Sequence, residues 1–165
     1  MGLFDKLFKK EELPVFDDET IISVCDGELI PTKDIADAMF AESMMGQTIG
    51  IEPANGDIVS PCNGTIEALF PTGHAFCVRM ADGTGILIHI GIDTVSLNGD
   101  GFKVYKKQGD SVKAGEKVVS MDISKVKDKG LHTTTMVIVT EPVDGKSYNF
   151  IEPQKVTKYQ SILKK

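Results

Sequence analysis

Most of the chain after residue 20 consists of short stretches in which apolar and polar residues alternate. Turn-forming dipeptides separate these stretches: Asp26-Gly27, Asn63-Gly64, Asp82-Gly83, Asp100-Gly101 and Asp144-Gly145. Short runs between such turns are typical of antiparallel β-strands. The pattern predicts an all-β fold, an antiparallel β-sandwich or barrel with only short helices. The best helical candidate within it is the segment 35–45, where Ile35, Ala38 and Met39 share one face.

Two segments repeat one short pattern. Cys25-Asp26-Gly27-Glu28-Leu29 is echoed by Cys62-Asn63-Gly64-Thr65-Ile66, and each places a turn directly before a predicted strand. The echo hints at a repeated structural unit. Residues 109–118 carry glycines at 109 and 115 on either side of a turn, which allows tight reversals. This segment is similar to those of barrel-sandwich domains, which include carrier domains and some zinc peptidases.

A hairpin is predicted around Asp82-Gly83, the dipeptide best suited to a two-residue type I′ turn. In that register His89 lies opposite Phe76, and His74 is its diagonal neighbour on the same face, roughly 7–8 Å away at Cα. Two imidazole rings can meet over that distance. A three-residue loop would shift the register by one residue and place the two rings on opposite faces.

Length and composition narrow the class of protein. The chain of 165 residues is long enough to bury a core, and we expect one β domain over residues 21–165. Three cysteines without C-x-x-C spacing predict packing residues in a reducing compartment. The net charge of −6, with both signs mixed along the chain, gives no support to a nucleic-acid surface. Because no run of about 18 apolar residues appears, we expect a cytoplasmic protein.

Residues 1–20 form a separate segment that we expect to be flexible. Leu3, Phe4, Leu7 and Phe8 recur at helical spacing within residues 1–10, and three lysines occupy the remaining faces. A short basic amphipathic helix of this kind can lie on a membrane surface. The pattern equally fits a frayed tail or a helix docked on its own domain. Residues 11–20 are acidic and contain Pro14, which is typical of a linker.

His74 and His89 fall on the predicted hairpin, and three kinds of chemistry suit a pair of imidazoles. The first is phosphoryl carriage, in which one ring attacks phosphorus and the other donates to the phosphate oxygens. The second is zinc hydrolysis, which requires three protein ligands. Position 91 is glycine, so an H-x-H pair is absent, and His132 has no partner nearby in the sequence. The third is a lipoyl or biotinyl carrier, whose lysine is missing from the Asp82-Gly83 tip.

Three stretches closely resemble the glucose-type enzyme IIA (EIIA) of the bacterial phosphoenolpyruvate-dependent sugar phosphotransferase system. They are TGHAF at 72–76, ILIHIGIDTVSLNGDGF at 86–102, and the segment 109–118. The likeness extends from about residue 21 to residue 165. It implies an all-β barrel-like sandwich with a topology like the duplicated hybrid motif, and no cofactor. It also implies a phosphotransferase component that takes a phosphoryl group from phospho-HPr and passes it to the IIB domain of a sugar permease.

The resemblance assigns roles to the residues around the two histidines. His89 would accept the phosphoryl group through Nε2, while the backbone carbonyl of Gly91 holds its Nδ1–H. His74 would donate a hydrogen bond to the phosphoryl group without being phosphorylated, and Thr72 would orient the active histidine. The histidines would bind zinc only with help from a partner's carboxylate, so we expect no intrinsic metal site.

The family surrounds its histidines with an exposed apolar collar that docks HPr and the IIB domain. Phe40, Met44, Met45 and Phe70 stand at the matching positions, with Asp93 as a charged neighbour. Methionines suit a surface that fits several partners, although residues of these types also occur in cores. Two rivals remain: a zinc-dependent peptidase-like hydrolase on a related barrel-sandwich fold, and a regulatory paralogue that no longer transfers phosphate.

Overall fold

The computed structural model of the protein describes residues 13–164. An eight-stranded sheet has the order β11-β1-β2-β10-β6-β5-β4-β8, and a three-stranded sheet has the order β3-β9-β7, with antiparallel neighbours throughout. The strands are β1 (Gly27–Ile30), β2 (Gln47–Pro53), β3 (Asp57–Val59), β4 (Gly64–Leu69), β5 (Ala75–Arg79), β6 (Gly85–Ile90), β7 (Phe102–Val104), β8 (Ser111–Val112), β9 (Lys117–Met121), β10 (Thr135–Glu141) and β11 (Lys155–Val156). Among the described residues, the helices are α2 (Ala38–Ala41) and α3 (Ile123–Asp128), with short 3₁₀ turns η1 (Thr32–Asp34), η2 (Thr94–Leu97) and η3 (Val143–Gly145). The predicted all-β class is confirmed.

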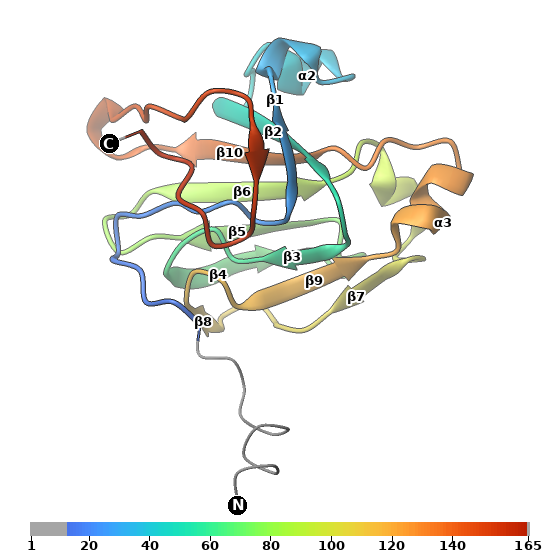
Figure 1. The fold of residues 1–165 in the computed structure, drawn as a ribbon. Coiled ribbons are helices and arrows are strands. Elements are labelled where there is room, and N and C mark those ends of the chain that lie inside the picture. The colour runs from blue at the N-terminus through green and yellow to red at the C-terminus, as the bar shows by residue number, and fades with distance from the viewer. Residues whose placement is uncertain (1–12, 165) are drawn as a thin grey trace, which may run out of the picture.

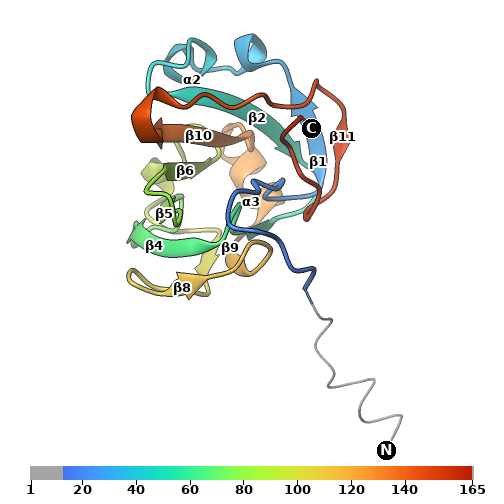
Figure 2. The same cartoon turned by 90° about the vertical axis from the view of Figure 1, so that its left-hand side faces the viewer.

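The two sheets enclose one main hydrophobic core. Figure 2 shows β2, β10, β6, β5 and β4 following one another along one side of the molecule, with β1 and β11 on the opposite side. Alternate residues of β5 and β6, such as Phe76 and Ile88, point into this core and are fully buried. Burying a side chain of that size contributes roughly 1.5–3 kcal/mol. The intervening residues, which include His89, therefore face the outside of the sheet.

The β5–β6 hairpin differs from the predicted one by a single residue. Ala75, not Phe76, lies opposite His89, and Phe76 pairs with Ile88. The loop has three residues, closed by a hydrogen bond from Met80 N to Thr84 O of 2.8 Å. Gly83 there adopts a φ of +95°, as expected for a type I turn followed by a glycine bulge.

The type I′ turn prediction is therefore wrong, and the reason lies in the strands. A two-residue turn would pair the core-facing residues of β5 with the outward-facing residues of β6, because the two sets are out of phase in that register. The observed register places Phe76 beside Ile88 and Val78 beside Ile86, and all four side chains are fully buried. Burying the core-facing residues of β5 and β6 side by side stabilises the hairpin more than the preference of Asp-Gly for a two-residue turn.

The helical prediction for residues 35–45 was too long. Helix α2 begins after Asp37, whose Oδ1 accepts the backbone N–H of Met39 at 2.9 Å. It ends within two turns because Ser43 and Gly46 take positive φ angles of 53° and 139°. Figure 1 shows α2 at one end of the molecule, over β2.

Helix α3 was not predicted, although its ends carry ordinary signals. The Asp122 side chain accepts the N–H of Lys125 at 3.1 Å, and Gly130 follows the last turn with a φ of +76°. An aspartate cap and a terminal glycine are typical helix boundaries. With six residues and Val126 as its buried residue, the helix shows too little periodicity to stand out in the sequence.

The two echoed segments share one local structure. In each, a buried serine hydroxyl donates to the carbonyl oxygen of the cysteine two residues later, at 2.7 Å in both: Ser23 to Cys25 and Ser60 to Cys62. Both cysteines are fully buried, and burial raises the pKa of the Cys25 thiol to about 12. These two thiols are packing residues, as predicted, since the reactive thiolate form is strongly disfavoured there.

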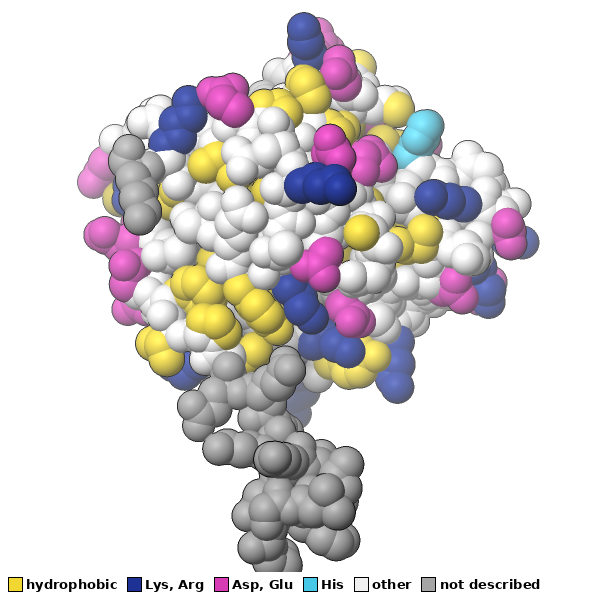
Figure 3. Space-filling model, viewed as in Figure 1, with side chains coloured by type: hydrophobic (Ala, Val, Ile, Leu, Met, Phe, Trp, Pro, Cys, Tyr) yellow, Lys and Arg dark blue, Asp and Glu magenta, His cyan; other side chains and the backbone are white. Residues whose placement is uncertain are grey.

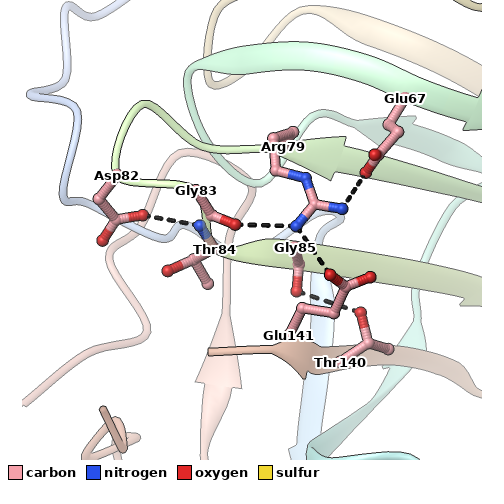
Figure 4. A network of polar contacts seen from close by, with 8 residues as sticks. All are labelled: Glu67, Arg79, Asp82, Gly83, Thr84, Gly85, Thr140 and Glu141. Atoms are coloured by element: carbon pink, nitrogen blue, oxygen red, sulfur yellow. Dashed lines mark hydrogen bonds and ion pairs between the residues drawn. The ribbon is translucent and has the colours of Figure 1, made fainter. Parts of the chain in front are cut away.

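A cluster of polar side chains surrounds the turn of the β5–β6 hairpin at the protein surface (Figure 4). The Arg79 guanidinium donates to Gly83 O at 2.8 Å, to Glu141 Oε2 at 3.1 Å, and to Glu67 Oε2. It thus joins β4, the β5–β6 turn and the end of β10. Each exposed ion pair contributes at most about 1 kcal/mol. Over the face drawn in Figure 3, charges of both signs are mingled, with hydrophobic areas between them, the broadest at the lower left.

The described part of the N-terminal segment lies against the domain. Phe16 packs beside Ile22 and Val59, and its carbonyl accepts the Asn63 side-chain N–H at 2.8 Å. The amphipathic helix predicted within residues 1–10 lies outside the described residues. Among residues 13–164, the structure contains no helix of the length and apolarity needed to cross a bilayer.

Candidate functional site

His89 stands near the end of β6 on the outer face of the sheet, where its ring is half-buried. Its Nδ1 lies 2.8 Å from the carbonyl oxygen of Gly91. A carbonyl oxygen only accepts, so Nδ1 carries the proton of the neutral ring and Nε2 keeps its lone pair. The Phe40 ring packs against the imidazole with centroids 5.0 Å apart. The geometry therefore presents a neutral histidine with one free nucleophilic nitrogen.

The Gly91 carbonyl reaches back to His89 because the chain turns sharply after β6. Gly91 has a φ of +78°, a conformation that residues with a Cβ rarely adopt. Its N–H donates to Thr134 O at 3.0 Å, and the next N–H, from Ile92, donates to His132 O at 3.0 Å. The third histidine thus takes part through its backbone, while its side chain is exposed.

His74 lies directly before β5, and its ring meets that of His89 edge-on at a centroid distance of 5.4 Å. The two rings share a face although the loop has three residues, which contradicts the expected consequence of such a loop. Alternation begins only at Ala75, and Gly73 turns the preceding chain with a φ of +74°. The rule of alternate faces therefore does not apply to His74.

The Thr72 hydroxyl pairs with His74, and among residues 13–164 it makes no hydrogen bond to His89. Its Oγ1 lies 2.5 Å from His74 Nδ1. When the hydroxyl donates to Nδ1, the neutral His74 ring carries its proton on Nε2. The ring is also held by the Phe70 side chain, at a centroid distance of 5.3 Å, and the His74 carbonyl accepts Ile90 N–H at 2.7 Å. In that arrangement, the Nε2–H of His74 is free to donate a hydrogen bond next to His89.

Both imidazoles are weaker bases than a free histidine. Burial lowers the pKa of His89 below its usual 6.5, and the Gly91 hydrogen bond and the charges of Asp37 and Asp93 offset part of this effect. Burial also lowers the pKa of His74, and the neighbouring His89 lowers it further. At neutral pH both rings are therefore uncharged, as a nucleophile and a tautomer-specific donor require.

These lowered pKa values predict how stability depends on pH. Below about pH 6.5 the unfolded chain binds protons that the folded site refuses, so the free energy of unfolding falls as the pH drops toward the folded pKa values. The stability advantage of the wild type over His74→Gln should therefore shrink between about pH 7.5 and about pH 5.5. Urea unfolding at both pH values measures it, and a difference that stays constant would contradict the lowered pKa of His74.

Exposed apolar side chains stand on the segments around the two rings. Three of the predicted collar residues are open to solvent: Met44 (70%), Phe70 (46%) and Met45 (38%). Phe40, which was predicted to be an exposed collar residue, is instead buried at 3% exposure, and its ring packs against the His89 imidazole. Asp93 is exposed on the loop after Gly91, with a φ of 60°.

Sequence reasoning missed three residues of this surface. Met39 and Val95 are exposed and belong to α2 and η2, which adjoin the site. Asp37 caps α2 and its charge acts on His89. The capping position of Asp37 before a short apolar run was the signal that could have revealed it.

Metal chemistry would need more ligands than the two rings offer. Within residues 13–164, no group of three or more His, Cys, Asp or Glu side chains is arranged to hold a metal ion. A zinc hydrolase requires three protein ligands and an open position. His74 and His89 alone supply two nitrogens.

A family model, the sequences of curated proteins and a solved structure all indicate the same protein family. Residues 19–144 match the family described as the phosphoenolpyruvate-dependent sugar phosphotransferase system, EIIA 1. The PTS system glucose-specific EIIA component of Oceanobacillus iheyensis is 38% identical over 156 residues, which cover 94% of this chain and 93% of that protein. The PTS system glucose-specific EIICBA component of Streptococcus pneumoniae is 43% identical over 122 residues, 74% of this chain and 17% of that protein. The solved glucose permease IIA of Mycoplasma capricolum superposes with a TM-score of 0.83 at 33% identity, covering 87% of this chain and 93% of that one.

Proposed function

Because the chain belongs to the EIIA family of the phosphoenolpyruvate-dependent sugar phosphotransferase system, we propose that it carries the phosphoryl group on Nε2 of His89. The protein is a phosphocarrier component of that system. The observation that supports His89 is the hydrogen bond between its Nδ1 and Gly91 O, at 2.8 Å, which leaves Nε2 unprotonated. Within residues 13–164, the His74 ring has no comparable carbonyl partner, and its Nδ1 pairs with the Thr72 hydroxyl instead.

The transfer step needs little covalent machinery from the protein. The Nε2 lone pair of His89 forms the new N–P bond while the bond from phosphorus to the donor's nitrogen breaks, and that electron pair returns to the donor. Such transfer depends on positioning and on stabilising the charge of the phosphoryl oxygens. His74 Nε2–H, at a ring distance of 5.4 Å, is placed to donate to those oxygens. The onward step repeats the exchange in the opposite direction.

A permease partner is supported by relatives in which an EIIA segment is continuous with an EIICB segment in one chain. The finer proposal is that HPr delivers the phosphoryl group and a IIB domain removes it at the same surface. A site with two neutral rings and an apolar rim can exclude water when a partner covers it, which protects the labile N–P bond from hydrolysis. We define the docking surface by Met39, Met44, Met45, Phe70 and Val95.

The docking surface predicts a specific effect of one exposed methionine. Met44→Asp should slow phosphoryl transfer from phospho-HPr and to a IIB domain about tenfold or more, because a charge that loses its water within the docking surface costs binding free energy. Quench-flow transfer of radiolabelled phosphate in each direction measures the rates. Val15→Asp, a change at another exposed apolar residue, is the matched control and should transfer normally. Equal transfer rates for Met44→Asp and Val15→Asp would show that Met44 is not part of the docking surface.

We further propose that the protein works in the cytoplasm, at the inner face of the membrane, where residues 1–10 contact anionic lipid. The apolar spacing of Leu3, Phe4, Leu7 and Phe8 beside three lysines supports this. The full chain should bind weakly to vesicles that contain anionic lipid, and deletion of residues 1–10 should abolish the binding in co-sedimentation. If the truncated protein binds equally well, the segment is not the contact.

A further inference from the structure

We propose that Thr94 is a positioning residue, which fixes the Gly91 carbonyl and through it the tautomer of His89. This inference rests on the proposed role of His89 as phosphoryl acceptor. Among residues 13–164, the Thr94 side chain makes no hydrogen bond to either histidine ring. Its hydroxyl donates instead to the backbone of the turn that lies between β6 and η2. The turn decides where the Gly91 oxygen points.

The hydroxyl of Thr94 holds the residue before Gly91. Thr94 is fully buried, and its Oγ1 donates to the carbonyl oxygen of Ile90 at 2.5 Å. The N–H of Ile90 donates in turn to His74 O at 2.7 Å. Both backbone polar groups of Ile90 are therefore hydrogen-bonded: its N–H to His74 and its carbonyl oxygen to Thr94.

The methyl group of Thr94 fills the space that glycine leaves at position 91. A Cβ on Gly91 would lie 2.4 Å from Thr94 Cγ2, so the methyl group packs against the bare Cα. The two N–H groups of the turn, on Gly91 and Ile92, are held by Thr134 O and His132 O at 3.0 Å each. These two hydrogen bonds and the bond from the Thr94 hydroxyl to Ile90 O hold the peptide between Gly91 and Ile92 in one orientation, and its oxygen lies 2.8 Å from His89 Nδ1.

Loss of the Thr94 hydroxyl should loosen this arrangement. The buried Ile90 carbonyl would lose a hydrogen-bond partner, and the turn would relax to satisfy it. A displaced Gly91 oxygen no longer selects the Nδ1–H tautomer, so part of the His89 population would carry its proton on Nε2. That tautomer cannot attack phosphorus with Nε2, which links the buried threonine to the rate of phosphoryl uptake.

The test compares Thr94→Val, which keeps the shape and removes the hydroxyl, with Thr94→Ser, which keeps the hydroxyl. Long-range ¹H–¹⁵N spectra of the full chain report the His89 tautomer directly, without any phosphoryl donor. The wild type and Thr94→Ser should show His89 protonated at Nδ1 alone. Thr94→Val should show a second tautomer and accept phosphate from phospho-HPr about tenfold more slowly, equivalent to about 1.4 kcal/mol in the barrier.

The outcomes separate three situations. A folded Thr94→Val protein with the wild-type tautomer and uptake rate would overturn the proposal and leave Thr94 a purely structural residue. A wild-type protein with His89 protonated at Nε2 would contradict the proposed acceptor geometry itself, whatever the variants show. If Thr94→Val does not fold, Thr94→Cys, with a weak S–H donor of similar size, should show the same tautomer change to a smaller extent, and an unchanged tautomer would again overturn the proposal.

Discussion

His89→Gln is expected to abolish phosphoryl uptake while the protein stays folded. Glutamine is similar in size and remains polar, but its amide has no nucleophilic lone pair on nitrogen. Incubation with phosphoenolpyruvate, enzyme I and HPr should charge the wild type with one acid-labile phosphate and leave His89→Gln at background. Intact-mass spectrometry at neutral pH measures the difference. Stoichiometric phosphate on His89→Gln would show that another residue is the acceptor.

His74→Gln is the informative companion of that variant. It should still accept phosphate, because His89 keeps its Gly91 contact, but onward transfer to a IIB domain should slow about 10²-fold, as for the loss of one preorganised donor to a transition state. Rates of label transfer in the two directions separate the steps. Complete loss of acceptance in His74→Gln would show that the first step cannot proceed without the His74 donor, which contradicts the expected outcome.

Gly91→Ala is expected to lower the free energy of unfolding by about 2–5 kcal/mol, the second large effect. The positive φ of +78° costs an alanine about 1–2 kcal/mol, and the new methyl group would collide with Thr94 Cγ2 at 2.4 Å, which adds an overpacking cost of about 1–3 kcal/mol. The turn would have to move, so phosphoryl uptake should fall as well. Urea unfolding at constant m-value measures the stability.

Gly130→Ala provides the matched control. Gly130 has nearly the same φ, +76°, but a Cβ there would meet nothing within 4 Å. Its substitution should cost only the backbone strain, about 1–2 kcal/mol, and leave phosphoryl uptake unchanged. The difference between the two variants isolates the contact with Thr94. Equal costs for Gly91→Ala and Gly130→Ala would mean that the turn after β6 accommodates a side chain freely.

The alternating pattern of the strands predicted the all-β class. At the β5–β6 hairpin, the apolar pattern of the two strands determines the register, and the turn preference of Asp-Gly does not. Phe76 and Val78 on one strand, and Ile86 and Ile88 on the next, are apolar at even positions. A register that pairs them was readable from the sequence, yet it conflicts with the preference of Asp-Gly for a two-residue turn. Buried pairs along a whole strand outweigh the preference of one dipeptide for a two-residue turn.

The sequence predicted those site contacts that the family resemblance implies or that join residues close together in the chain. The Gly91–His89 contact spans two residues, and its predicted geometry is present in the structure. The contact of the Thr72 hydroxyl with His74 Nδ1 depends on the turn at Gly73, which the alternation rule ignores. The burial of Phe40 depends on α2 packing over β6 and β10, a long-range contact that no local pattern reports.

The most direct test of the account is the position of the phosphoryl group on the charged wild-type protein. Phosphorus and ¹⁵N NMR of the full chain, charged by enzyme I and HPr, distinguish Nε2-phosphohistidine from Nδ1-phosphohistidine and identify the residue. The account predicts a single phosphoryl group on Nε2 of His89, with Nδ1–H still bonded to Gly91 O. A phosphoryl group on Nδ1 of His89, or on either nitrogen of His74, would contradict it.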